Sequence, residues 1–72
     1  MNRKEAITKW FAGPDHHTTI EDVELIESGH GDMGVANYRI TFPNEVSDWR
    51  MYFDAETGEV IDGYTYQTIM EY

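Results

Sequence analysis

The sequence contains no cysteine and no long apolar segment, and it has few basic residues. Without cysteine, the chain cannot use a disulfide or a thiolate metal site for stability. No segment approaches the roughly 20 apolar residues that a membrane-spanning helix needs, so we expect no membrane partner. No apolar signal-peptide segment follows the charged residues 3–5, so we expect a cytoplasmic protein.

A catalytic constellation is also missing from the sequence. Ser28 and Ser47 have no histidine at a spacing typical of nucleophilic catalysis. Carboxylates are numerous, but in an acidic chain their closeness in sequence says little about acid–base chemistry. We therefore expect a protein that is not an enzyme and that uses no cofactor.

Charge is the strongest compositional signal. The chain carries 14 acidic and 5 basic residues, a net charge of −9, and residues 10–72 hold only two basic residues, Arg39 and Arg50. Direct binding of DNA or RNA is disfavoured because the phosphate backbone would be repelled. The acidic surface either keeps the protein soluble or engages a protein partner with a basic surface.

Length limits how much core the chain can build. Seventy-two residues allow one domain, residues 1–72, and such a chain buries only about 60% of the surface that its unfolded form exposes. Aromatic residues, 14% of the chain, are the main source of buried area. Association into a homodimer is a second route to stability.

Apolar periodicity predicts a helix followed by strands. Asn2 is a good N-cap, and Ile7, Trp10 and Phe11 form a helical stripe. Later segments alternate with the period of two that half-buried strands show. We expect an α+β fold in which this helix packs on a three- to four-stranded antiparallel meander. The expected bounds are about 2–12 for the helix and about 19–28, 36–42, 48–54 and 59–70 for the strands. A short helix from Gln67 is the alternative for the last segment.

Two motifs invite site assignments. Asp15, His16 and His17 place a carboxylate beside two imidazoles, but neighbours in an extended segment point apart, and only His30 could add a further imidazole. Residues 29–34 match the spacing G-x-G-x-x-G, but a strand pattern follows where a dinucleotide site needs a helix. We expect neither a metal site nor a nucleotide site here.

The segment Trp49–Ile61 organises the predicted sheet. Trp49, Met51 and Phe53 alternate with polar neighbours, and Asp54 to Gly58 have the residue types of a hairpin turn. This segment, Trp-Arg-Met-Tyr-Phe-Asp-Ala-Glu-Thr-Gly-Glu-Val-Ile, resembles the signature of the PepSY family, and residues 37–42 resemble its middle strand. The resemblance implies a PepSY- or cystatin-like helix on an antiparallel sheet, with an inhibitory or regulatory role.

Two functional hypotheses follow. The first is a small acidic, non-catalytic module that binds a protein through the free face or an edge of its sheet. The alternative is an acidic decoy of the phage type, such as an anti-CRISPR protein, which imitates nucleic-acid phosphates and blocks a basic groove. The candidate partner-binding residues are the acidic residues Glu21, Asp22, Glu24, Glu27, Asp32, Glu45 and Asp48 and the tyrosines Tyr52, Tyr64 and Tyr66.

Overall fold

The computed structural model describes residues 2–28 and 34–72. Within these residues the helix α1 (Arg3–Ala12) is followed by the strands β1 (Asp22–Ser28), β2 (Val35–Thr41), β3 (Glu45–Phe53) and β4 (Val60–Glu71). The strands form one antiparallel sheet in the order β1-β2-β3-β4. The predicted α+β fold, a helix on an antiparallel meander, is therefore confirmed. The C-terminal segment is a strand and not a helix.

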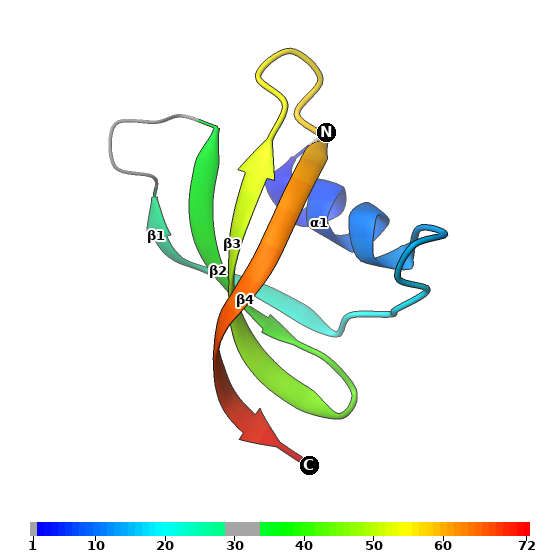
Figure 1. Ribbon diagram of the computed structural model, residues 1–72, viewed down its shortest axis with the longest axis vertical. Coiled ribbons are helices and arrows are strands. Elements are labelled where there is room, and N and C mark those ends of the chain that lie inside the picture. Colours follow the sequence, from blue (N-terminus) through cyan, green and yellow to red (C-terminus); the bar gives the residue numbers. More distant parts are fainter. Residues whose placement is uncertain (1, 29–33) are drawn as a thin grey trace.

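Helix α1 begins at a side-chain cap. The Asn2 side-chain oxygen accepts the backbone N–H of Glu5 at 2.8 Å, and the Asn2 amide donates to the Glu5 carboxylate at 2.8 Å. The first bond satisfies one of the backbone N–H groups that a helix start leaves without a partner, and the second links the two side chains. Figure 1 shows α1 on one side of the sheet, beside the beginning of β4. No helix in the described part of the chain is long and apolar enough to cross a membrane.

The core lies between α1 and one face of the sheet, which we call the covered face. Phe11 meets Phe42 and Trp49 edge to face, with ring centroids 5.2 and 5.0 Å apart. Such aromatic contacts add to the free energy gained by burying apolar area. The buried core residues are Ala6, Ile7, Phe11, Ala36, Tyr38, Ile40, Phe42, Met51, Phe53 and Val60.

The turn between β3 and β4 has the predicted chemistry. The Asp54 carboxylate accepts the backbone N–H groups of Glu56 at 2.8 Å and Thr57 at 3.0 Å. Gly58 has φ 77°, and its N–H donates to the Asp54 carbonyl at 2.9 Å. The hydrogen bonds from Thr57 and then Glu56 hold the pKa of Asp54 below its usual value.

The connection between the strands expected at 36–42 and 48–54 is shorter than predicted, and that prediction is corrected here. β3 begins at Glu45, and only Phe42, Pro43 and Asn44 separate it from β2. The Phe42 N–H donates to the Glu45 carbonyl at 2.7 Å, which closes a tight hairpin. β1 also begins later than expected, at Asp22. Polar residues in segment 45–48 hide its strand pattern, because both Ser47 and Asp48, which point to opposite faces of the sheet, are buried polar residues.

Candidate functional site

The face of the sheet opposite α1, which we call the open face, carries a polar centre on β2 and β3. Arg39 lies opposite Asp48, and Asn37 lies opposite Arg50, in the β2–β3 ladder. These positions alternate with the buried residues of the covered face, as the sequence pattern predicts. The candidate site is therefore built on the two central strands of the sheet, which hold its residues in a fixed register.

Arg39 and Asp48 form a two-point ion pair. Arg39 Nε donates to Asp48 Oδ1 at 2.8 Å, and Arg39 Nη2 donates to Asp48 Oδ2 at 3.1 Å. The Asp48 side chain is only 5% exposed, whereas that of Arg39 is 41% exposed. The hydrogen bond to Asp48 raises the pKa of Arg39, against a smaller opposing effect of burial, and the charges of Asp48 and Glu24 add to the rise. Since its carboxylate is engaged inside the fold, we leave Asp48 out of the proposed contact set.

Arg50 is held in a similar way. Its Nε donates to the Asn37 side-chain oxygen at 3.1 Å, and Asn37 is buried. Alternation along the strands agrees with the open-face position of Arg39 and Arg50, but the sequence gives no sign that each has a partner on the neighbouring strand. The alternation of arginines with buried aromatic positions was the only signal for these residues.

Three tyrosines border this polar centre. Tyr64 lies opposite Arg50, and its ring centroid is 6.3 Å from that of Tyr52. Tyr66 has no partner in the β3–β4 ladder, because the register shifts between Asp48, opposite Gln67, and Trp49, opposite Thr65. Burial is the main cause that raises the pKa of the Tyr66 hydroxyl, and the negative charge of Asp48 raises it further. Since Asp48, Arg50 and Arg39 of the open face all act on this hydroxyl, it lies near that face. Tyr64 and Tyr66 are 47% and 46% exposed.

The acidic strand β1 contributes to the same face. Glu24 lies opposite Arg39, and Glu27 lies opposite Asn37. Simple alternation would place these two residues on different faces. A bulge at Ile26 shifts the register between Leu25 and Glu27, and the shift returns Glu27 to the open face. The structure thus places two of the acidic candidates, Glu24 and Glu27, on the same face as the tyrosine candidates.

Other acidic candidates lie elsewhere. Asp22, at the beginning of β1, has its carboxylate 3.5 Å from Lys4 of the helix. Glu21 is exposed and comes just before β1, and its backbone N–H donates to the Thr41 carbonyl. Glu45 is half-buried and lies opposite Glu71 at the far end of the sheet. Asp32, like most of the G-x-G-x-x-G segment, falls outside the described residues.

Both edge strands are bulged. β1 has the irregularity at Ile26, and the β3–β4 ladder has three, which leave Ile61, Tyr66 and Ile69 as extra residues on β4. Bulges interrupt the regular row of N–H and C=O groups that an added strand would use. These edges are therefore poor templates for strand addition, and the open face is the better candidate for binding.

The histidine motif has a packing role. His16 lies against the Trp10 ring with centroids 4.3 Å apart and against Phe11 at 5.6 Å. His17 has φ 51°, and its N–H donates to the Gly13 carbonyl at 2.9 Å. Among residues 2–28 and 34–72, no three histidine or carboxylate side chains lie close enough together to hold a metal ion.

The open face thus has two hydrogen-bonded arginines at its centre, tyrosines on one side and carboxylates on the other. The sequence matches no protein-family model, no curated protein and no solved structure.

Proposed function

We propose that this chain is a small acidic, non-catalytic module that binds a protein partner through the open face. The observation that supports this most is the joining of exposed tyrosines and the carboxylates of β1 on one uncovered sheet face. Tyrosines supply large contact area with a polar tip, and they are enriched at protein interfaces. The PepSY resemblance of residues 49–61 favours an inhibitory or regulatory role for the binding.

The partner that suits this face has lysine or arginine at its contact surface. Glu24 and Glu27 lie at the β1 border of the open face, and the whole chain has a net charge of −9. Carboxylates at the border of an interface steer a basic partner and fix its orientation. Tyr64 and Tyr66 would then supply most of the contact free energy.

The test compares two open-face variants with two matched controls. One variant carries Tyr64→Ala and Tyr66→Ala, and its control carries Tyr72→Ala, since Tyr72 is exposed at the chain end. The other variant carries Glu24→Gln and Glu27→Gln, and its control carries Glu56→Gln and Glu71→Gln. Each protein is immobilised, and the amount of each host protein retained is compared across the set. The affinity of a retained partner is then measured by calorimetry.

We expect the tyrosine variant to weaken binding at least about tenfold. The carboxylate variant should weaken it less and should reduce its dependence on salt. Both controls should bind like the unchanged protein. The proposal is wrong if both open-face variants bind like the unchanged protein. It is also wrong if the control variants lose as much affinity as the open-face variants.

The acidic-decoy hypothesis gives a different result in the same experiment. A decoy would lose binding in the carboxylate variant and keep it in the tyrosine variant, and DNA or RNA would displace it from its partner. A second copy of the chain as the partner would appear as concentration-dependent mass in sedimentation. The first result would favour the acidic decoy over the proposed module. The second would identify a second copy of the chain as the partner.

A further inference from the structure

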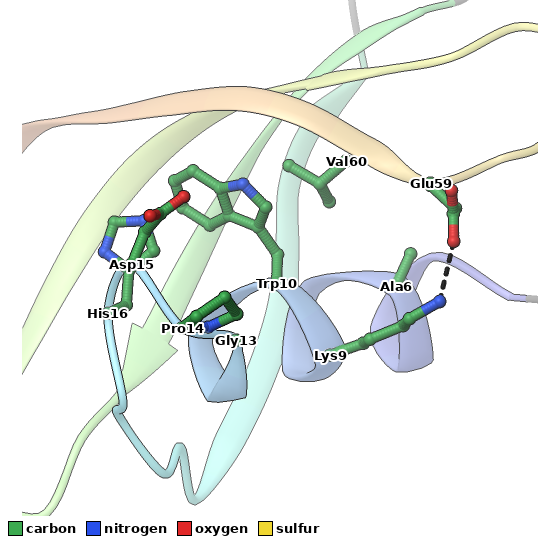
Figure 2. A pocket seen from close by; sticks show the side chains of 9 residues that line it. All are labelled: Ala6, Lys9, Trp10, Gly13, Pro14, Asp15, His16, Glu59 and Val60. Carbon is green, nitrogen blue, oxygen red and sulfur yellow. Dashed lines mark hydrogen bonds and ion pairs between the residues drawn. The ribbon is translucent and has the colours of Figure 1, made fainter.

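A cleft lies on the helix side of the molecule, away from the open face. Its volume is about 290 Å³, and its walls are the second half of α1, the loop after it and the beginning of β4. Ala6, Trp10 and Val60 supply apolar surface, and charged side chains stand at both ends (Figure 2). This volume is near the lower limit of ligand pockets, about 300 Å³, so the cleft suits a group of side-chain size.

The charges of the cleft are unevenly balanced. At one end, Lys9 Nζ is 2.7 Å from Glu59 Oε1, so these two charges offset each other. At the other end lie Asp15, His16 and Trp10. Among the described residues, the Asp15 carboxylate makes no ion pair or hydrogen bond. The cleft therefore keeps an uncompensated negative charge at the Asp15 end.

The helix adds to this negative potential. α1 ends at Ala12, and Gly13 and Pro14 form part of the cleft wall. The last carbonyl groups of a helix carry a partial negative charge that favours cations within about one turn. An anion entering the cleft would meet both this end of the helix and the carboxylate of Asp15.

Trp10 gives the cleft a fixed aromatic wall. Its ring packs against His16, with centroids 4.3 Å apart, and meets the Phe11 ring edge to face at 5.0 Å. A ring held on two sides presents a constant π surface, and indole is the side chain that attracts cations best.

From these features we propose that the cleft binds an organic cation, an ammonium or guanidinium group, between the Asp15 carboxylate and the Trp10 ring. The apolar wall of Ala6 and Val60 accepts the hydrocarbon attached to the charged group. This site is separate from the open face and does not depend on the proposed function. The cation is either a lysine or arginine side chain of a protein, or a free small amine.

The test is an NMR titration of the full chain with n-butylammonium and with n-butylguanidinium. 1-Butanol, a neutral molecule of similar size, is the control ligand. The two indole N–H signals give the readout: Trp10 lines the cleft, and the Trp49 indole donates to Ser47 at 2.8 Å in a different part of the core. We expect a saturable shift of the Trp10 signal with a dissociation constant in the millimolar range, as few ligand atoms make contact.

Two charge variants test whether cation binding depends on Asp15 or only on the net negative charge of the chain. Asp15→Asn should weaken binding of both cations about fivefold, because it removes one carboxylate from a partly exposed site. Glu56→Gln, which removes the same charge from an exposed turn position, should leave the affinity unchanged. Equal affinity for 1-butanol, no effect of Asp15→Asn, or no saturable Trp10 shift would each overturn the proposal.

A blocked tripeptide, acetyl-Gly-Lys-Gly-amide, distinguishes the two sources of the cation. Affinity at least equal to that of n-butylammonium supports a protein side chain as the natural occupant. Binding of n-butylammonium but not of the tripeptide supports a free small amine.

Discussion

The two faces of the sheet are built from the same strands and differ in what holds them. The covered face is closed by apolar and aromatic side chains under α1, and Ile40 and Met51 on it are fully buried. The open face is held by polar pairs, Arg39 with Asp48 and Arg50 with Asn37. Residue parity along each strand decides which face a side chain joins. One face therefore provides stability, and the other is left available for contact.

Bulges modify that simple division at both edges. On β1 the bulge at Ile26 moves Glu27 to the open face, and on β4 the extra residue Tyr66 stands beside the same polar centre. In each case a register shift adds a polar or aromatic side chain to the open face. The difference between the faces thus depends on the register as well as on composition.

The largest expected effect is a loss of stability on the covered face that the open face does not show. Ile40→Ala should lower the free energy of unfolding by about 2–5 kcal/mol, because Ile40 is fully buried and the cavity left behind cannot fill. Tyr64→Ala, at a side chain 47% exposed, should cost less than about 1 kcal/mol. Urea denaturation of the two variants measures both values. Similar losses would mean that the open face is also a structural core.

The second prediction concerns Gly63, which lies opposite the buried Met51. A Cβ added at Gly63 would lie 2.7 Å from the Met51 sulfur, and Met51 is fully buried. Gly63→Ala should therefore cost about 1–3 kcal/mol of unfolding free energy through overpacking. The double variant with Met51→Val should cost less than the sum of the two single changes, since valine leaves room for the new methyl group. An additive double variant would show that position 63 is not packed against Met51.

A smaller effect is expected at the turn that connects β3 and β4 at one end of the sheet. Gly58 has φ 77°, which β-branched residues adopt poorly. Gly58→Val should cost roughly 1–2 kcal/mol, and Gly58→Asn should cost less because asparagine tolerates this region. Thermal or urea unfolding gives the ranking. A valine variant as stable as the unchanged protein would contradict the positive φ.

Much of the fold could be predicted from the sequence because its signals are local. The Asn2 cap, the helical stripe of Ile7 and Phe11, and the turn from Asp54 to Gly58 each depend on a few neighbouring residues. The period-two pattern of residues 36–42 also assigned its side chains to the correct faces. Signals of this kind can be recognised within a short window of sequence.

The candidate sites could be predicted only in part because they depend on register and on distant segments. Nothing in the sequence near Ile26 marks a bulge, so the direction of Glu27 could not be read. The burial of Asp48 depends on Arg39 of the neighbouring strand. The helix-side cleft joins Asp15 to Glu59, two residues far apart in sequence.

The smallest predicted effect is a change in acid sensitivity at the turn. Because the folded pKa of Asp54 lies below its ordinary value of 3.8, its ionised form stabilises the fold. That contribution is fully present above the ordinary value and is lost as the pH falls toward the lower folded value. Asp54→Asn should therefore be less stable than the unchanged protein at neutral pH, and the difference should shrink in acid. Glu56→Gln is the control, since the Glu56 carboxylate forms none of the described hydrogen bonds of the turn. Urea midpoints measured from neutral pH to below the ordinary carboxyl range give the comparison, and a constant difference between Asp54→Asn and the unchanged protein would contradict the assigned hydrogen bonds.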